Sequence, residues 1–77
     1  MERKELTETV EVNGSRYIVK GMVEFAPVSG STQGVWQWDG RFTPAVMPIY
    51  ISASDTEAAM IIAIEQFNKR HEEVETT

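Results

Sequence analysis

The chain has 77 residues, enough for a single domain spanning residues 1–77, and 42% of them are hydrophobic, which predicts a folded chain rather than a disordered one. Seven basic and twelve acidic residues give a net charge of −5, which disfavours non-specific binding to nucleic acid. The absence of cysteine excludes disulfides and thiolate chemistry. No apolar run is long enough to span a bilayer, and the charged start lacks the pattern of a signal peptide, so we expect a cytoplasmic protein.

The first structural signal is Asn13-Gly14, which lies between two stretches of alternating apolar residues. Asn-Gly favours positive φ at both central positions of a two-residue β-hairpin turn. Such a turn sets the register, so that Glu11 faces Arg16. The alternation then gives one apolar face, made of Val10, Val12, Tyr17, Val19, Val23 and Phe25. Residues 1–5 are expected to be a flexible tail.

A loop is predicted at residues 26–34, which are rich in glycine and hydroxyl side chains. Residues 35–38, Val-Trp-Gln-Trp, then predict a short strand. Asp39-Gly40 is a second two-residue turn signal, and it would place Trp38 opposite Arg41.

The return strand is harder to place because Pro44 and Pro48 cannot donate to a ladder. We therefore expect it to be broken or to lie at a sheet edge, with residues 49–51 as its strand core. Residues 34–48 fit either one strand or a hairpin, so the sheet has three to four strands.

A helix is predicted from Ser54, where Ser54 and Glu57 fit a capping box, to about His71. Residues 72–77 are expected to be a flexible tail. The helical period predicts one stripe facing the sheet: Met60, Ala63, Ile64, Phe67 and Val74. The expected fold is α+β, a small antiparallel β-meander with one C-terminal α-helix packed on one face (ββββα).

The helix is apolar on all sides over residues 58–64. One sheet covers one face of a helix, so the side that carries Ala58, Ala59 and Ile62 needs another cover. A folded-back loop is one candidate, and contact with a second copy or another protein is the other. The second option predicts a small acidic non-catalytic protein-interaction module that forms a homodimer through its C-terminal helix.

Trp36 and Trp38 share one face of their strand. Either both belong to the core under the helix, which suits a domain short of apolar volume, or they form an exposed pair beside Arg41. An exposed pair would contact a protein or stack on bases. Together with Arg16 and Lys20 on the sheet, it would make a nucleic-acid-binding module, the alternative function.

The chain offers little for catalysis. His71 is its single histidine, so nucleophile–histidine–acid chemistry depends on this one side chain. His71 and Glu75 supply two of the three or four ligands that a zinc site needs. No glycine-rich phosphate loop is present. We expect no enzyme activity, no cofactor, no metal and no small-molecule substrate.

The stretch from Ile49 to Phe67, a strand running into a capped helix, resembles the arrangement in the arm-type DNA-binding domains of tyrosine recombinases and in plant AP2 domains. The resemblance covers about a quarter of the chain and implies DNA recognition by the sheet. Those families use a basic sheet, whereas the sheet region here holds Arg16, Lys20 and Arg41.

Acidic residues dominate the last third of the chain, at positions 55, 57, 65, 72, 73 and 75. In composition the chain resembles small accessory proteins of phages and mobile elements, including inhibitors of host defence. This predicts a further alternative, an acidic accessory protein that inhibits or mimics nucleic acid on a host protein.

Overall fold

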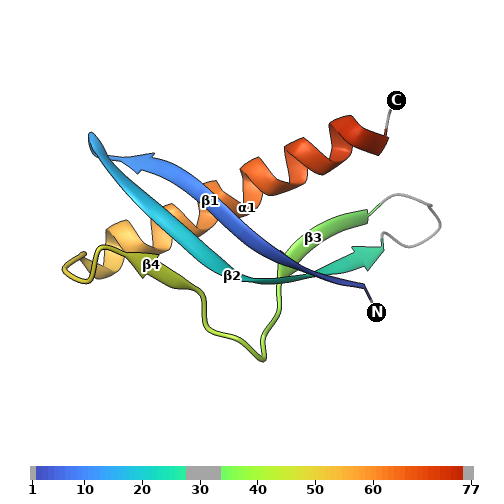
Figure 1. Ribbon diagram of the computed structural model, residues 1–77, viewed down its shortest axis with the longest axis horizontal. Coiled ribbons are helices and arrows are strands. Elements are labelled where there is room, and N and C mark those ends of the chain that lie inside the picture. The colour runs from blue at the N-terminus through green and yellow to red at the C-terminus, as the bar shows by residue number, and fades with distance from the viewer. Residues whose placement is uncertain (1, 28–33, 76–77) are drawn as a thin grey trace.

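The computed structural model describes residues 2–27 and 34–75 and contains one antiparallel sheet and one helix (Figure 1). The elements follow in the order β1 (Arg3–Val12), β2 (Ser15–Pro27), β3 (Gly34–Trp38), β4 (Ala45–Met47) and α1 (Ala53–Glu75). The expected ββββα fold of the α+β class is confirmed. Most of the loop expected at residues 26–34 lies outside the described residues. Residues 3–5 belong to β1 and residues 72–75 to α1, and the flexibility of the two ends stays a prediction.

The hairpin of β1 and β2 has the predicted register. Asn13 and Gly14 both have positive φ, 51° and 81°, as the two-residue turn requires. Glu11 faces Arg16, and Val10 faces Tyr17. The alternation of burial in both strands follows the predicted apolar face. A local turn therefore fixes the pairing of the two longest strands.

β3 and β4 occupy the same edge of β2, one after the other. β3 pairs with residues 23–27 of β2, and β4 pairs with residues 18–20. The chain leaves this edge after Trp38 and rejoins it at Ala45. The hairpin expected at Asp39-Gly40 is therefore wrong, because the chain after this turn pairs with β2 and not with β3. Residues 49–51 form no strand.

Gly21 lies where β3 ends and β4 has not yet begun. A Cβ atom at this position would lie 2.9 Å from Cζ3 of Trp38 and 3.3 Å from Cα of Pro44. The missing side chain lets the Trp38 ring lie across β2 on the core side of the sheet. Gly21 thus marks the break in the edge.

α1 begins one residue earlier than expected, and Ser52 is its N-cap. The Ser52 hydroxyl accepts from the Asp55 N–H at 3.1 Å, the bond that an N-cap side chain makes. The predicted capping box at Ser54 and Glu57 is therefore wrong. The helix contacts the sheet through Ala59, Ala63 and Phe67, each one turn apart.

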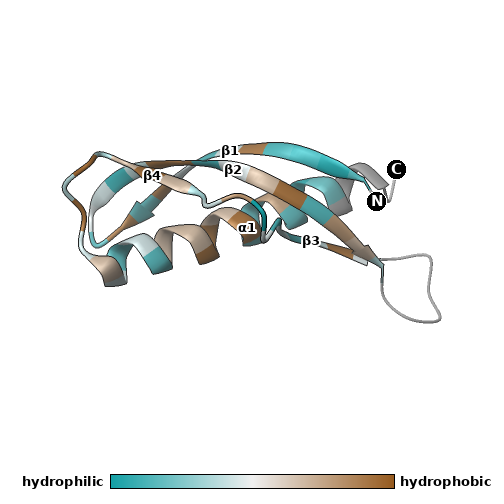
Figure 2. Ribbon diagram, turned by 90° about the horizontal axis from the view of Figure 1, so that it is seen from below, coloured by the Kyte–Doolittle hydropathy of each residue, from teal (hydrophilic) through white to brown (hydrophobic). Residues whose placement is uncertain are grey.

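The sheet curls around the helix, as Figure 2 shows from the side: β1 and β2 lie above α1, and β3 descends to its level. The core lies between these layers and contains Leu6, Val10, Val12, Tyr17, Val19, Val23, Trp36, Ala59, Ala63 and Phe67. Within the part of the chain that the structure describes, no helix has the length and apolarity needed to cross a membrane.

Candidate protein interface

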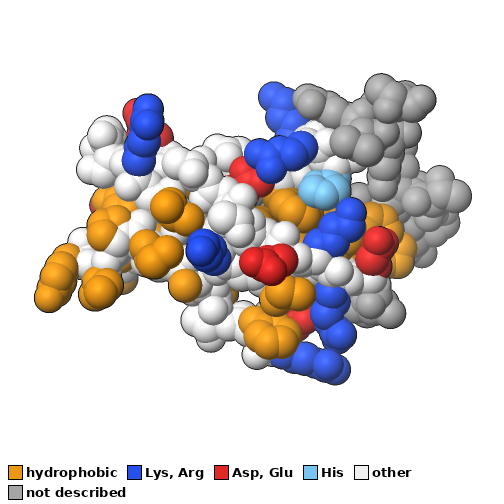
Figure 3. Space-filling model, in the orientation of Figure 1, with side chains coloured by type: hydrophobic (Ala, Val, Ile, Leu, Met, Phe, Trp, Pro, Cys, Tyr) orange, Lys and Arg blue, Asp and Glu red, His pale blue; other side chains and the backbone are white. Residues whose placement is uncertain are grey.

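Four apolar side chains gather at one end of the molecule, over β4 and the segment that follows it (Figure 3). Ile49 is 85% exposed and Tyr50 is 96% exposed. Met47 is also exposed and pairs directly with the exposed Ile18 of β2. We call Ile18, Met47, Ile49 and Tyr50 the apolar tip. Contiguous apolar patches are typical of interaction surfaces, whereas single exposed apolar residues are common on any protein.

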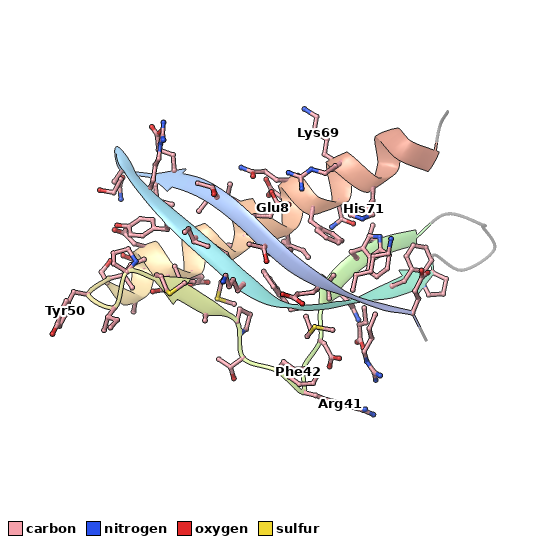
Figure 4. All side chains as sticks on the ribbon, in the orientation of Figure 1. Glu8, Arg41, Phe42, Tyr50, Lys69 and His71 are labelled. Atoms are coloured by element: carbon pink, nitrogen blue, oxygen red, sulfur yellow. The ribbon has the colours of Figure 1, made fainter. Side chains whose placement is uncertain are left out.

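Met47, Ile49 and Tyr50 lie on a chain segment that is held at both ends. The segment begins with β4, which is hydrogen-bonded to β2. It ends with Ile51, which packs against the core, and with Ser52, the N-cap of the helix. Between these anchors, the Tyr50 side chain points away from the rest of the molecule (Figure 4). No charged residue stands between Arg41 and Asp55 in the sequence, so the segment that carries Met47, Ile49 and Tyr50 is uncharged. Ile18 lies between Arg16 and Lys20 on the exposed face of β2.

The helix residues predicted as an interface, Ala58, Ala59 and Ile62, do not share one uncovered side of the helix. Ala59 is fully buried against the sheet, so it is not available to a partner. Ala58 and Ile62 are half-buried and pack against the edge of the core. The sheet therefore covers Ala59 in addition to residues of the predicted stripe. The predicted stripe residues Ala63 and Phe67 do contact the sheet.

Trp36 belongs to the core, with 6% of its surface exposed, so it is not the exposed stacking residue of the alternative reading. Its ring meets Phe25 and Phe67 edge to face, with centroids 5.4 and 5.7 Å apart. Lys4 lies over the same ring, with Nζ 5.2 Å from the centroid. Trp38 is half-buried and packs against the core across Gly21. The tryptophan pair is therefore a packing feature.

The backbone of Trp36 is bound by a side chain of the helix. Asn68 Oδ1 accepts from the Trp36 N–H at 2.6 Å, and Asn68 Nδ2 donates to the Trp36 carbonyl at 2.9 Å. The amide thus pairs with the strand edge as another strand would. The sequence signal for this contact is weak, because one asparagine on a helix has many alternative roles.

The basic candidates do not form one cluster. Arg16 and Lys20 are exposed on the sheet face that points away from the helix. Arg41 is exposed in the turn after β3, beside Phe42 and far from the apolar tip (Figure 4). With Trp36 buried, the structure does not unite these cations with an aromatic stacking surface.

Two buried carboxylates were missed by the sequence reasoning. Glu8 is 3% exposed and accepts from both terminal nitrogens of Arg70, at 2.7 and 2.9 Å. Asp39 is 1% exposed; its Oδ2 lies 2.9 Å from Nε of Arg3, and its Oδ1 accepts from the Arg41 N–H. The signal for Glu8 was its place between Leu6 and Val10 in the apolar alternation. Both pairs fix chain segments: β1 to the helix, and the end of β3 to β1.

The single histidine is part of the helix packing. Its ring stacks on Phe67 with centroids 4.0 Å apart, and Nδ1 lies 2.9 Å from the Phe67 carbonyl oxygen. The side chain of Glu75, its potential partner for a metal, lies outside the described side chains. Among the residues that are described, no three histidines or carboxylates come together in the way a metal ion needs.

The acidic residues proposed for mimicry are only partly described. Asp55 faces the hairpin turn and binds Asn13 Nδ2 at 3.0 Å. Glu57 and Glu65 are exposed on the helix. The side chains at positions 72, 73 and 75 lie outside the described side chains. The apolar tip is therefore the surface feature with the clearest definition.

Comparison with known proteins adds no relative: no protein-family model, no curated protein and no solved structure matches this chain.

Proposed function

We propose that this chain is a non-catalytic protein-interaction module that binds another protein through the apolar tip. The observation that carries the proposal is the exposure of Ile49 and Tyr50, 85% and 96%, on a segment anchored at both ends. A backbone segment held in this way loses little conformational entropy on binding, and aromatic side chains such as Tyr50 are prominent among the residues that dominate interface energetics. This proposal moves the predicted interface from the helix to the tip.

The chemistry of the tip favours an apolar groove on a protein over a lipid surface. Segments that insert into anionic membranes carry basic residues beside their apolar side chains. Met47, Ile49 and Tyr50 lie in a segment without charge, the basic neighbours of Ile18 on its sheet face are Arg16 and Lys20, and the whole chain has a net charge of −5. An apolar tip on an acidic protein is repelled by an anionic lipid surface and is better suited to an apolar groove on a protein.

The test is site-specific photocrosslinking in living cells of the source organism. A benzophenone amino acid replaces Tyr50 in one variant and Phe42 in a matched control, because Phe42 is also an exposed aromatic residue in an irregular segment. The expected result is one or more defined adducts with another protein from position 50 that position 42 does not give. Adding Ile49→Ser to the first variant is expected to abolish them.

Two outcomes contradict the proposal. One is the absence of any adduct at position 50 while the protein is folded and expressed. The other is the same set of adducts from both positions, since that result reports chance collisions rather than a binding surface.

A further inference from the structure

The inference concerns β1, which lies at the free edge of the sheet. The Phe25 N–H donates to the Glu2 carbonyl at 3.0 Å, so Glu2 and Phe25 form a closely bonded pair. In an antiparallel ladder such pairs alternate, so even-numbered residues of β1 bond to β2 and odd-numbered ones direct their N–H and C=O groups outward. The outward residues are Arg3, Glu5, Thr7, Thr9 and Glu11. Within the described residues, no backbone hydrogen bond of the chain uses this edge.

The opposite edge is treated differently. At β3, the outward N–H and C=O groups of Trp36 are both bound by the Asn68 side chain. Five residues of β1 with outward backbone groups thus contrast with β3, where the outward groups of Trp36 are bound. A long unpaired edge is a template for the addition of a strand.

We propose that β1 pairs antiparallel with β1 of a second copy of this chain, with Thr7 of both copies on the two-fold axis. The two strands bond only if residues with outward backbone groups lie opposite each other. The possible registers therefore differ by steps of two residues. With Thr7 opposite Thr7, Arg3 faces Glu11 of the second copy and Glu5 faces its Thr9, so all five outward residues are bonded. A shift of one step in either direction bonds only four of them.

Charge selects the same register. Within one chain, Glu11 faces Arg16 and Arg3 faces Glu24. Across the proposed junction, Glu11 comes opposite the second copy's Arg3, whose Nε also lies 2.9 Å from Oδ2 of Asp39 in its own chain. The symmetry places this pair of opposite charges twice across the junction. A shift that places Glu5 opposite Glu11 sets like charges against each other instead.

The helix passes behind β1 and β2, and its C-terminal half extends past the β1 edge (Figure 1). The two-fold axis therefore places both helices of the pair on one face of a continuous eight-stranded sheet. Arg70 binds Glu8 of β1 and Asn68 binds β3, which defines the two flanks of the helix. The helical period puts Ile62 and Ala58 on the β1 flank. Both are half-buried in one copy, and in the pair they face the second helix.

The register is tested by disulfide trapping, because the natural chain has no cysteine. Opposed residues of a closely bonded pair have Cα atoms about 5.5 Å apart, within reach of a disulfide. Thr7→Cys is therefore expected to form a covalent dimer at least about tenfold faster than Thr9→Cys, whose two copies are offset by about 14 Å along the strand. A mixture of Glu5→Cys and Thr9→Cys chains is expected to form the mixed dimer at a rate similar to Thr7→Cys.

Native mass spectrometry of the full chain at high micromolar concentration provides the second measurement. The expected species has twice the 8.7 kDa of one chain. Thr7→Pro removes an outward N–H while sparing every bond to β2, so a monomer with an unchanged circular dichroism spectrum is expected. Thr7→Val keeps the N–H group and is expected to remain dimeric.

Three results would overturn the inference: an 8.7 kDa monomer for the natural chain, equal trapping rates at positions 7 and 9, or a dimer that survives Thr7→Pro. A dimer that dissociates on Tyr50→Ser while Thr7→Pro leaves it intact also overturns it, since self-association then runs through the apolar tip. The proposed tip function is judged separately, by its crosslinking to other proteins.

Discussion

Asn68 of α1 pairs with both backbone groups of Trp36 in β3, at 2.6 and 2.9 Å, and so serves as the neighbour that this strand edge lacks. The same amide donates to the Ile64 carbonyl, which orients it along the helix. One side chain therefore joins the helix, the curled end of the sheet and the buried indole. The stability of this end of the core depends on it.

Replacing Asn68 with alanine is expected to lower the free energy of unfolding by about 2 kcal/mol, because two partly buried backbone groups lose their partners. Urea denaturation followed by tryptophan fluorescence measures the change. Hydrogen exchange at the Trp36 amide should accelerate more than exchange in the β1–β2 hairpin. Lys69→Ala, one residue further on the exposed side, is the control and should stay within about 0.5 kcal/mol of the natural chain. Equal stability of the two variants would show that the contact contributes nothing.

Removing one partner of the Glu8–Arg70 pair is expected to lower the free energy of unfolding strongly, whereas replacing both with apolar residues should lower it little. Arg70→Ala leaves a carboxylate that is 3% exposed without its partner, and we expect a loss of about 2–3 kcal/mol. The double variant Glu8→Leu with Arg70→Leu removes both charges and fills the space, so most of the loss should be recovered. Chemical denaturation of Glu8→Leu, Arg70→Leu and the double variant, beside the natural chain, forms a complete cycle. A double variant as unstable as the sum of the single ones contradicts the argument.

Adding a single methyl group at Gly21 is expected to destabilise the fold. The added Cβ would meet the Trp38 ring at 2.9 Å and the Pro44 backbone at 3.3 Å, so Gly21→Ala should destabilise by about 1–3 kcal/mol. Gly40 offers the matched control, since a Cβ there meets nothing within 4 Å. Thermal melting of both variants tests the difference. If Gly40→Ala is the more harmful change, the break in the sheet edge is not placed as described.

The N-terminus of the helix distinguishes between two serines. Ser52 accepts from the Asp55 N–H, whereas Ser54 lies inside the first turn. Ser52→Ala is expected to cost about 1 kcal/mol of stability, and Ser54→Ala should cost nothing measurable. Urea titrations of the two variants decide the matter. The reverse order would restore the capping box at Ser54 and Glu57 and exclude the Ser52 cap.

The features that the sequence predicted well are those that neighbouring residues determine. Asn13-Gly14 fixes a two-residue turn, and the register of Glu11 with Arg16 follows from it with no information from the rest of the chain. The position of the helix was predicted to within one residue at its start for the same reason. Four strands and one helix then allow few arrangements.

The features that the sequence did not predict depend on distant partners. Asp39-Gly40 is a good local hairpin signal, yet the returning chain pairs with the part of the β2 edge that β3 leaves unpaired. The phase of the helix was ambiguous because residues 58–64 are apolar all round, and only the curl of the sheet decides which side is covered. The apolar tip was missed because Ile49 and Tyr50 were assigned to a strand core.

The detour between Trp38 and Ala45 has a practical consequence. The chain leaves and rejoins the same edge of β2, so the pairing on either side is fixed by β2 itself and not by the length of the detour. Lengthening a surface connection costs only the slowly growing entropy of closing a larger loop. Thr43, which is exposed and lies beyond the turn that the Asp39 carbonyl closes with the Phe42 N–H, is therefore a site for grafting a foreign peptide. Such a graft would display its cargo while leaving both the apolar tip and the β1 edge untouched.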